Sequence, residues 1–456
     1  VENCTNRVNI TTESMRDKNA MVGGVVGAMM NSSSKSSSVV GCSNYGTISG
    51  GDNAYLGGIV GSSSYGTGIV DCVNHGAVTG KASLGGIVGR NGVPVRNCRN
   101  DAAVTGTGDE IGGIAGFSNA AITGCYNTAA ISGAGTKEGV GGILGRAHNA
   151  YGGSVAGCLN TGAVTATGEL AGAIVGSKGS NVMPAAANCY YLESTCGQGI
   201  GSNVMEDDHT AAVTQEELTQ PRLAGLLGGE FATCNDGTAP VLKWENSDAS
   251  YVLYFAVTPA GASISLTKDG QAVTAAGTGC YLVGAGSYAY TVTKTGYDPA
   301  SGTVEFTNSQ CVPIDLALET FPVTFSVTPS DAVITVSNAA GQTVAPGEGG
   351  YRLINGAYTY AVSKFGYVTQ TGAFTVANAA VEVPAITLAE APRYAVTLAL
   401  TYDGTVPADT AVTVYADGAA VATSTESTLP DGDYTYKITA TGYFTAEVEF
   451  TVHGAD

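Results

Sequence analysis

Two side chains that can do chemistry, a thiol and an amide, recur at fixed positions through the first part of the chain. Seven cysteines share one position in the repeat: Cys4, Cys42, Cys72, Cys98, Cys125, Cys158 and Cys189. The first six of them are followed two residues later by an asparagine: Asn6, Asn44, Asn74, Asn100, Asn127 and Asn160. Repeated thiols can bind a metal or form disulfides, and a row of amides can bind a ligand.

We expect the thiols of this ladder to be buried and free. Stacked strands hold equivalent residues about 4.8 Å apart, whereas the Cβ atoms of a disulfide are about 3.5–4.5 Å apart. Bridging neighbours would therefore strain the chain, although a few bridges or a metal stay as alternatives. Cys189 with Cys196 and Cys280 with Cys311 are better disulfide candidates. Free thiols in an exported protein would indicate a reducing or anaerobic setting.

The asparagine ladder has two interpretations. Stacked asparagines commonly hydrogen-bond one another along a stack and tie down turns of the backbone. The same row could instead present amides to a ligand. We favour the structural interpretation.

Catalytic patterns are missing from the sequence. None of the four histidines is followed by Glu, so the zinc-peptidase pattern His-Glu-x-x-His is absent, and no serine lies in a Gly-x-Ser-x-Gly elbow. The one dense acidic cluster, Glu206 to His209, is expected to be a solvated loop. Arg90 and Arg146 are the only matching basic pair of the repeats, and Phe117 stands at the intervening copy. We predict no catalytic residue, no cofactor and no metal, with calcium as a minor alternative.

These residues must be positioned by a second repeated element, Gly-Gly-aliphatic. Its second glycines are 34, 28, 27, 29 and 30 residues apart, and their positions are Gly24, Gly58, Gly86, Gly113, Gly142 and, in a degenerate copy, Gly172. A near-constant period of about 30 residues is typical of a solenoid. Each period holds three short β segments separated by turns, so the fold class is all-β. We predict a three-sided, right-handed parallel β-helix over residues 1–204.

These repeats resemble the GLUG motif of bacterial surface and secreted proteins, including the non-catalytic portion of some immunoglobulin A peptidases. The resemblance covers about residues 1–200 and implies a repeat type rather than a function. Asn188-Cys189-Tyr190-Tyr191 looks like the last coil, since Tyr191 replaces the ladder asparagine. Residues 205–248 are expected to be a C-terminal cap, with one short helix begun by a capping box at Thr214.

A different period begins near residue 250. The motif Gly-x-Tyr-x-Tyr starts at Gly286, Gly356 and Gly432, and a Gly-Tyr pair follows each copy. Alternating residues of this kind predict half-buried antiparallel strands, with the tyrosines in the core. We predict three small β-sandwiches of immunoglobulin-like type at 249–320, 321–392 and 393–456. They resemble PEGA-type surface sandwiches, which implies extracellular spacers without catalysis.

The composition favours an extracellular location. The formal net charge is −19 and only 12% of residues are charged, so nucleic acid and anionic membranes are disfavoured as partners. No apolar stretch is long enough to span a bilayer. Because Cys4-Thr5-Asn6 already lies in mid-repeat, we expect the chain to be a portion of a longer surface protein, and a removed signal peptide is the alternative. We also expect the chain to be monomeric.

Two functions remain open. In the first, the β-helix of a surface adhesin or stalk presents a face to a host or microbial protein or glycan, and the sandwiches act as spacers. In the second, the chain is a carbohydrate-binding accessory region of a larger secreted hydrolase or peptidase. Its binding platform would be four aromatic residues, which can equally be isolated surface side chains: Tyr55, Tyr65, Phe117 and Tyr151.

Overall fold

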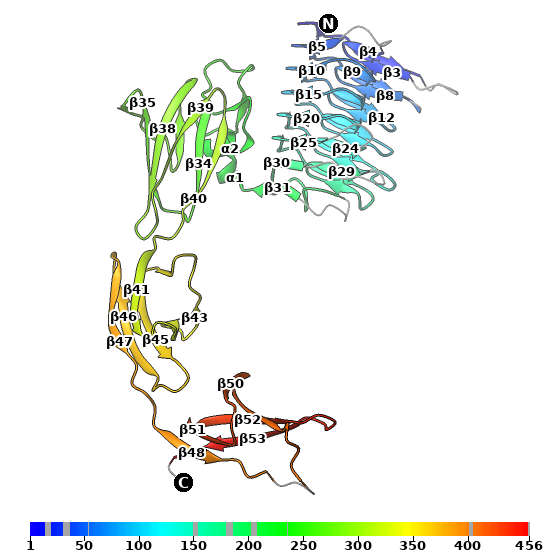
Figure 1. Ribbon diagram of the computed structural model, residues 1–456. Coiled ribbons are helices and arrows are strands. Elements are labelled where there is room, and N and C mark those ends of the chain that lie inside the picture. The colour runs from blue at the N-terminus through cyan, green and yellow to red at the C-terminus, as the bar shows by residue number, and fades with distance from the viewer. Residues whose placement is uncertain are drawn as a thin grey trace. The chain divides into compact units, whose positions relative to one another are not determined.

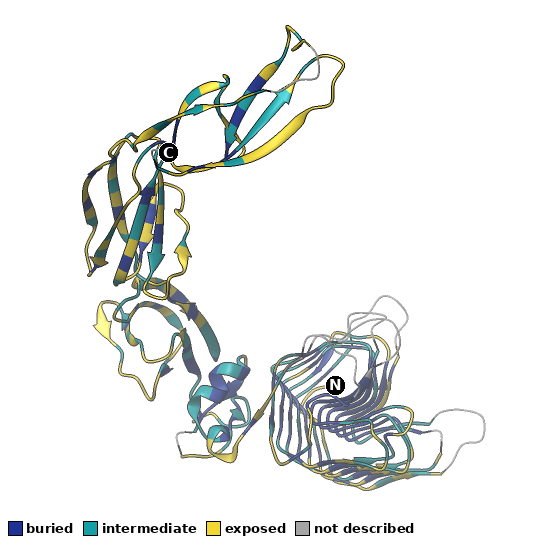
Figure 2. Ribbon diagram, turned by 90° about the horizontal axis from the view of Figure 1, so that it is seen from below, coloured by how far each residue is buried: buried dark blue, intermediate teal, exposed yellow. Residues whose placement is uncertain are grey.

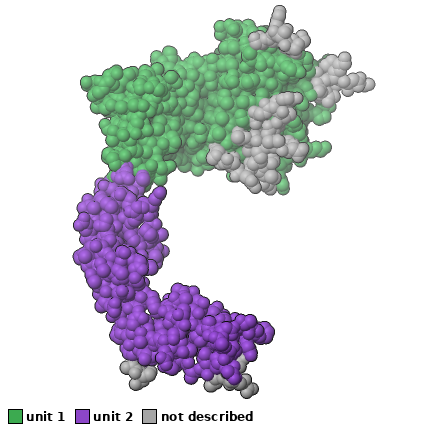
Figure 3. Space-filling model, viewed as in Figure 1, with its two compact units in different colours: residues 1–294, 299–316 green, residues 295–298, 317–456 purple. Residues whose placement is uncertain are grey.

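The protein is all-β, and its computed structural model describes most of the chain. The described residues are 1–13, 20–30, 37–52, 54–148, 154–178, 186–201, 208–234, 236–400 and 405–454. They form two compact units, one of residues 1–294 with 299–316 and the other of residues 295–298 with 317–456 (Figure 3). Parallel coils make up the first part of unit 1, and antiparallel sandwiches follow (Figure 1). The predicted fold class is confirmed.

The first coil contains four short strands and each of the next five contains five, and the strands pair in parallel with their equivalents in the neighbouring coils. Column 1 comprises β5 (Ser38–Val40), β10 (Gly68–Val70), β15 (Val95–Arg96), β20 (Ile122–Thr123) and β25 (Val155–Ala156). Column 2 comprises β1 (Thr5–Asn6), β6 (Ser43–Asn44), β11 (Val73–Asn74), β16 (Arg99–Asn100), β21 (Tyr126–Asn127) and β26 (Leu159–Asn160). Column 3 comprises β2 (Ile10–Thr12), β7 (Ile48–Gly50), β12 (Val78–Gly80), β17 (Val104–Gly106), β22 (Ile131–Gly133) and β27 (Val164–Ala166).

The remaining two columns follow the same order along the chain. Column 4 comprises β3 (Ala20–Gly23), β8 (Ala54–Gly57), β13 (Leu84–Gly85), β18 (Ile111–Gly112), β23 (Val140–Gly141) and β28 (Ala171–Gly172). Column 5 comprises β4 (Val26–Met29), β9 (Val60–Ser63), β14 (Val88–Asn91), β19 (Ala115–Ser118), β24 (Leu144–Ala147) and β29 (Val175–Lys178). Two longer strands, β30 (Ala186–Leu192) and β31 (Asp208–Val213), then add to columns 1 and 2.

The expectation of three segments in each coil was too coarse. Two of the three segments are split by a two-residue bend, at Asp71-Cys72 and at Gly86-Ile87 in one coil. Asp71 takes a positive φ of 53° at its bend, a conformation that Asp and Asn tolerate better than other side chains. Because of these bends, a complete coil has five strands instead of the three expected segments.

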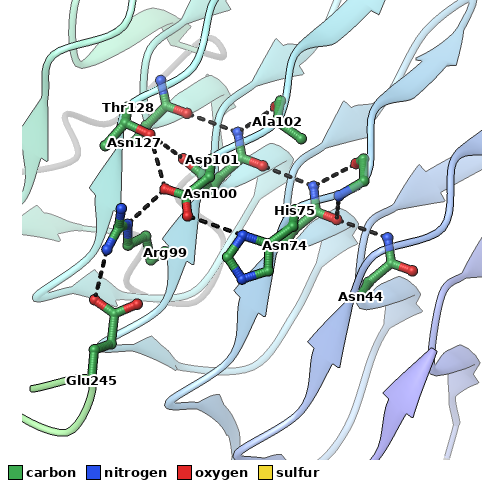
Figure 4. Close-up of polar contacts among 11 residues, drawn as sticks. Asn44, Asn74, His75, Arg99, Asn100, Asp101, Ala102, Asn127, Thr128 and Glu245 are labelled. Carbon is green, nitrogen blue, oxygen red and sulfur yellow. Dashed lines mark hydrogen bonds and ion pairs between the residues drawn. The ribbon is translucent and has the colours of Figure 1, made fainter. Parts of the chain in front are cut away.

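The asparagine ladder is structural (Figure 4). Each amide nitrogen donates to the amide oxygen of the next coil, as from Asn74 to Asn100 at 2.8 Å and from Asn100 to Asn127 at 2.8 Å. The same nitrogen also donates to a carbonyl two residues ahead, as from Asn100 to Ala102 at 2.9 Å. The ladder asparagines from Asn44 to Asn160 are fully buried. The amides therefore satisfy one another and the turn, and do not face a ligand.

The second glycine of each Gly-Gly pair faces a ladder asparagine across the coil. A Cβ atom added at Gly86 would overlap the side chain of Asn100, and equivalent overlaps recur at Gly58 with Asn74 and at Gly113 with Asn127. These contacts lie between two apolar clusters of the interior, one around Ile69 and Ile87 and the other around Ile48 and Leu84. Figure 2 shows the buried residues along the stacked strands of the coils.

The last repeat corrects one alignment made from the sequence. Gly172 pairs with Gly141, the first glycine of its pair, so Ala173 occupies the place of the second glycine. Tyr191 pairs with Asn160 and occupies the place of the next ladder asparagine. Glycine and asparagine are thus lost together, as their contact requires.

All eleven cysteines are free thiols. The disulfide proposed between Cys280 and Cys311 is wrong, because the two residues pair with opposite sides of Tyr254 and lie two strands apart. That separation is about 9–10 Å, beyond the reach of a disulfide. Cys189 and Cys196 are likewise unpaired. In the ladder, each thiol donates to a carbonyl two residues earlier, as from Cys98 to Arg96 at 3.2 Å.

The cap covers a flank of the coils as well as their end. The capping box at Thr214 and Glu217 is confirmed and begins α1 (Gln215–Leu218), but a second short helix, α2 (Pro221–Leu227), follows with Pro221 as its first residue. The helices and the hairpin of β32 (Phe231–Ala232) and β33 (Val241–Leu242) bury their apolar residues against Tyr126 and Leu159 of column 2. Trp244 donates to the carbonyl of Asn97 at 2.9 Å.

Three sandwiches follow, each of two sheets. The first contains β34 (Val252–Thr258), β35 (Ser263–Lys268), β36 (Gln271–Ala272), β37 (Cys280–Leu282), β38 (Gly286–Thr293), β39 (Ala300–Phe306) and β40 (Gln310–Asp315). The second contains β41 (Phe321–Thr328), β42 (Val333–Asn338), β43 (Thr343–Val344), β44 (Tyr351–Leu353), β45 (Gly356–Ser363), β46 (Gln370–Val376) and β47 (Val381–Thr387). The third contains β48 (Arg393–Thr397), β49 (Ala411–Ala416), β50 (Ala419–Ala422), β51 (Glu426–Pro430), β52 (Gly432–Thr439) and β53 (Ala446–Val452).

The first tyrosine of each sandwich motif is buried, as predicted. Its hydroxyl donates to the carbonyl four residues earlier, from Tyr288 at 2.7 Å, from Tyr358 at 3.1 Å and from Tyr434 at 2.8 Å. The bond satisfies the one polar atom of a buried ring.

Replacing Asn100 by Asp tests the ladder. Asn100→Asp removes both amide donors and puts a charge between acceptors at a fully buried position, so we expect a loss of at least about 3 kcal/mol in the free energy of unfolding. Asn9→Asp is the matched control, because exposed Asn9 only accepts a hydrogen bond, from the amide of Thr47 at 2.9 Å. Chemical denaturation of both variants measures the difference, and equal stabilities would contradict the ladder.

The thiols of the ladder should be unreactive in the folded protein. Burial raises the pKa of Cys98 and of Cys158 well above its usual value, so neither forms the thiolate that reacts. Alkylation at pH 8 with mass spectrometry should modify exposed Cys4 and leave the buried ladder thiols intact until unfolding. Because the thiols of Cys98 and Cys158 ionise near pH 9 in the unfolded chain and stay protonated when buried, these two residues should make the free energy of unfolding fall as the pH rises above about 9. Disulfides along the ladder in native protein would overturn this account.

Candidate functional site

The outward side chains of column 5 form a row across the coils. Pairing in register places Ser62, Arg90, Phe117, Arg146 and Ser177 at equivalent positions of successive strands. Side chains alternate between the two faces of a strand, so this row follows from the same register that fills the interior. Ser62, Phe117 and Ser177 are buried, so the part of the row around Arg90 is the best candidate for a binding surface.

Phe117 lies between the two arginines. The guanidinium carbon of Arg90 is 4.2 Å from the centre of the Phe117 ring, and that of Arg146 is 5.8 Å away. The ring is only 5% exposed. In the sequence, Phe117 stands at the repeat between those of Arg90 and Arg146. In the structure, the guanidinium groups of both arginines contact the Phe117 ring through cation–π interactions. It is not an isolated surface aromatic residue.

The other candidate aromatic residues fall into three cases. Tyr55, on the neighbouring column 4, has its ring 5.4 Å from the guanidinium carbon of Arg90. Tyr65 follows β9 and is 62% exposed. Tyr151 lies outside the described residues. The structure therefore brings Tyr55 and Phe117 together around Arg90.

A groove of about 530 Å³ joins Tyr65 to this arrangement. It is lined by Ser63, Ser64, Tyr65, Arg90, Asn91, Gly92, Phe117 and Asn119. Its floor is held by hydrogen bonds between coils, from Ser63 to Asn91 at 2.8 Å and from Asn91 to Ser118 at 2.8 Å. The amide oxygen of Asn119 is buried and has no hydrogen-bond partner within the described residues.

The two arginines differ in their electrostatic partners. Arg146 forms ion pairs with Glu110 at 3.0 Å and with Glu138 at 2.9 Å. Burial raises the pKa of Glu138 above its usual value. Arg90 forms no ion pair or hydrogen bond with the described residues, and its contacts are to aromatic rings. Its five N–H donors therefore have no acceptor among the described residues.

A second outward row, on column 2, was missed by the sequence analysis. It consists of the residues that directly follow the ladder asparagines: Arg7, Tyr45, His75, Asp101, Thr128 and Thr161. Their fixed position after each asparagine was the sequence signal that could have revealed this row. Tyr45 stacks on His75 with ring centres 4.6 Å apart, and Nδ1 of His75 lies 3.1 Å from the Asp101 carboxylate. Among the described residues, no nucleophile is in contact with the histidine of this row.

The His75–Asp101 pair serves the fold (Figure 4). The Asp101 carboxylate also accepts from Arg99 at 2.6 Å and from Thr128 at 2.9 Å. Arg99 in turn pairs with Glu245 of the cap at 3.3 Å. A carboxylate already shared among three partners is suited to fixing the cap on the coils rather than to proton transfer.

No group of histidines, cysteines and carboxylates within the described residues could hold a metal ion. Nor does any described helix have the length and apolar character needed to cross a membrane.

Comparison with known proteins gives fold-level likeness only. No family model and no curated protein matches the chain. A structure described as a candidate immunoglobulin A1 protease from Bacteroides ovatus is 21% identical over 52% of this chain and 74% of its own, with a TM-score of 0.34. A streptococcal ancillary pilin is 13% identical over 45% of this chain and 96% of its own, with a TM-score of 0.21.

A third match is a Bacteroides ovatus protein from a mixed-linkage glucan utilization locus, solved with a heptasaccharide. It is 15% identical over 43% of this chain and 61% of its own, with a TM-score of 0.09. TM-scores this low carry no argument about function, and the resemblance to GLUG and PEGA repeats stays a prediction.

Proposed function

We propose that the protein is a non-catalytic bacterial surface protein that acts as an adhesin or stalk. In this proposal the β-helix presents the groove of Tyr65, Arg90 and Phe117 to a ligand, and the sandwiches act as spacers in an extracellular setting. The observation that carries the proposal is Arg90, a half-buried guanidinium held between two aromatic rings and without a polar partner in the described part of the chain.

The geometry of the groove favours binding. Arg90 and Phe117 lie on paired strands whose neighbours fix them on both sides, so little side-chain freedom is lost when a ligand binds. An exposed tyrosine and a partly desolvated arginine are also the side chains most often dominant at interfaces. A groove of about 530 Å³ lies within the range of small-ligand sites.

The absence of catalysis is part of the proposal. His75 with Asp101 is the described pair most similar to a general base and its orienting carboxylate, but Asp101 is shared with Arg99 and Thr128. The pair therefore has a structural explanation.

The alternative function is a carbohydrate-binding accessory region of a larger secreted hydrolase or peptidase. One observation favours it, because the exposed Tyr65 ring borders a groove lined by serine and asparagine side chains. A sugar can stack its C–H face on such a ring while its hydroxyls bond to amides and hydroxyls. The two functions differ in the ligand and share the site.

Binding screens of the full chain separate these functions. The chain and its variants Tyr65→Ala and Arg90→Ala should be applied to a glycan array and to host extracellular-matrix proteins. Either substitution should weaken binding at least about tenfold, which corresponds to about 1.4 kcal/mol. Tyr45→Ala is the control, since Tyr45 is exposed on the other row and lines no part of the groove.

The class of ligand then decides between the two. A glycan ligand lost in both groove variants supports the accessory region, and a protein ligand lost in both supports the adhesin. Binding that survives both substitutions would show that the groove is not the site.

A further inference from the structure

The groove beside Arg90 has its shape because a glycine interrupts a row of outward positions. Asn91 of β14 pairs with Ser118 of β19, and both residues are buried. Side chains alternate along a strand, so the next places, Gly92 and Asn119, lie on the outer face. With no side chain at Gly92, a space opens between Ser64 of the preceding coil and Asn119 of the following coil.

Arg90 brings one positive charge to this groove. Among the described residues that line the groove, it is the one with a charged side chain, and no described carboxylate pairs with it. The aromatic rings of Tyr55 and Phe117 contact its guanidinium, whose N–H donors lie in the plane of the group. Two such donors match the two oxygens of a carboxylate.

The charge count favours a carboxylate over a phosphate. A carboxylate carries one negative charge and balances a single guanidinium, whereas a phosphate monoester carries up to two. The chain has a formal net charge of −19, so its field disfavours any excess negative charge on a ligand. A half-buried cation without a counter-charge also gains most from a ligand that supplies one.

Asn119 adds an acceptor to the same groove. Its Oδ1 atom is buried and accepts no hydrogen bond from the described residues. A buried acceptor without a donor is unfavourable, and a ligand hydroxyl would satisfy it. The ligand therefore needs a hydrogen-bond donor as well as a negative group.

The rest of the lining favours a sugar over a peptide. Tyr65 is 62% exposed, and a sugar ring can stack its C–H face on such a ring. Apart from Tyr65 and the 5% exposed Phe117, the lining consists of serine, asparagine, glycine and arginine. It offers no apolar pocket of the kind that specifies the side chains of a peptide.

We propose that this groove binds a carboxylate-bearing sugar unit of a glycan. The carboxylate pairs with Arg90, a hydroxyl donates to Oδ1 of Asn119, and the ring of the sugar stacks on Tyr65. The assignment rests on the proposed function, because it takes the groove as the binding site, and it adds the class of ligand.

Matched pairs of sugars test the carboxylate. The full chain is titrated, with ligand-observed NMR, with the methyl glycosides of glucuronic, galacturonic and N-acetylneuraminic acid. The same glycosides, with the carboxyl group reduced to an alcohol, are titrated beside them. We expect at least one acid to bind, and its reduced counterpart to bind at least about tenfold more weakly. A tripeptide of alanine and its C-terminal amide form a further pair that tests a peptide carboxylate.

Three variants locate the bound acid. Arg90→Gln should weaken its binding at least about tenfold. Arg96→Gln is the matched control, because it removes the same charge from an exposed residue outside the groove and should leave binding unchanged. Asn119→Leu should weaken binding at least about threefold without lowering the thermal unfolding midpoint, because the lost oxygen bonds to no described residue.

Failure of the assignment and failure of the groove give different results. The assignment is overturned if no acidic sugar binds more tightly than its reduced counterpart, or if the peptide acid alone does. The groove then remains the site when Arg90→Gln weakens a neutral glycan or a protein found in the binding screens. An acidic sugar that binds the chain and Arg90→Gln equally would overturn both the assignment and the groove.

Discussion

The structure of the β-helix depends on one contact, that of a buried asparagine amide with a glycine across the coil. The amide must donate both to the next coil and to its own turn, as Asn100 does to Asn127 and Ala102. The space that it needs exists only because Gly86 has no Cβ. A buried amide left without partners would cost about 1–3 kcal/mol, so the ladder is stable only as a continuous row. Where Tyr191 ends the row, Ala173 replaces the glycine.

The candidate site is a consequence of this regularity. The register that stacks inward residues also stacks the outward ones, so Arg90, Phe117 and Arg146 fall in one row without any loop to place them. Two carboxylates neutralise Arg146, and aromatic contacts hold Arg90. The row on column 2 uses the same register for a different purpose, since Arg99 binds the cap through Glu245. One repeat thus provides both the candidate binding face and an attachment for the cap.

Sequence patterns predicted the features that depend on residue spacing within a repeat or motif. They missed the features that depend on contacts between residues far apart in the sequence. The coils, the asparagine ladder, the buried tyrosines and the capping box at Thr214 could all be predicted from spacing. The flank position of the cap could not, because Trp244 meets Asn97 across 147 residues of sequence. The grouping of Tyr55 and Phe117 around Arg90 depends on how the strands of neighbouring coils pair, which the sequence does not show directly. In the last repeat, the glycine spacing gave the wrong alignment at Gly172.

The most direct test of the asparagine–glycine contact is the stability of Gly86→Ala beside that of Gly197→Ala. The new Cβ at Gly86 would overlap both the Asn100 side chain and the carbonyl of Gly113, whereas nothing lies within 4 Å of a Cβ at Gly197. Denaturant unfolding should show a loss of at least about 3 kcal/mol for Gly86→Ala and a change within about 1 kcal/mol for Gly197→Ala. Equal stabilities of the two variants would contradict the account.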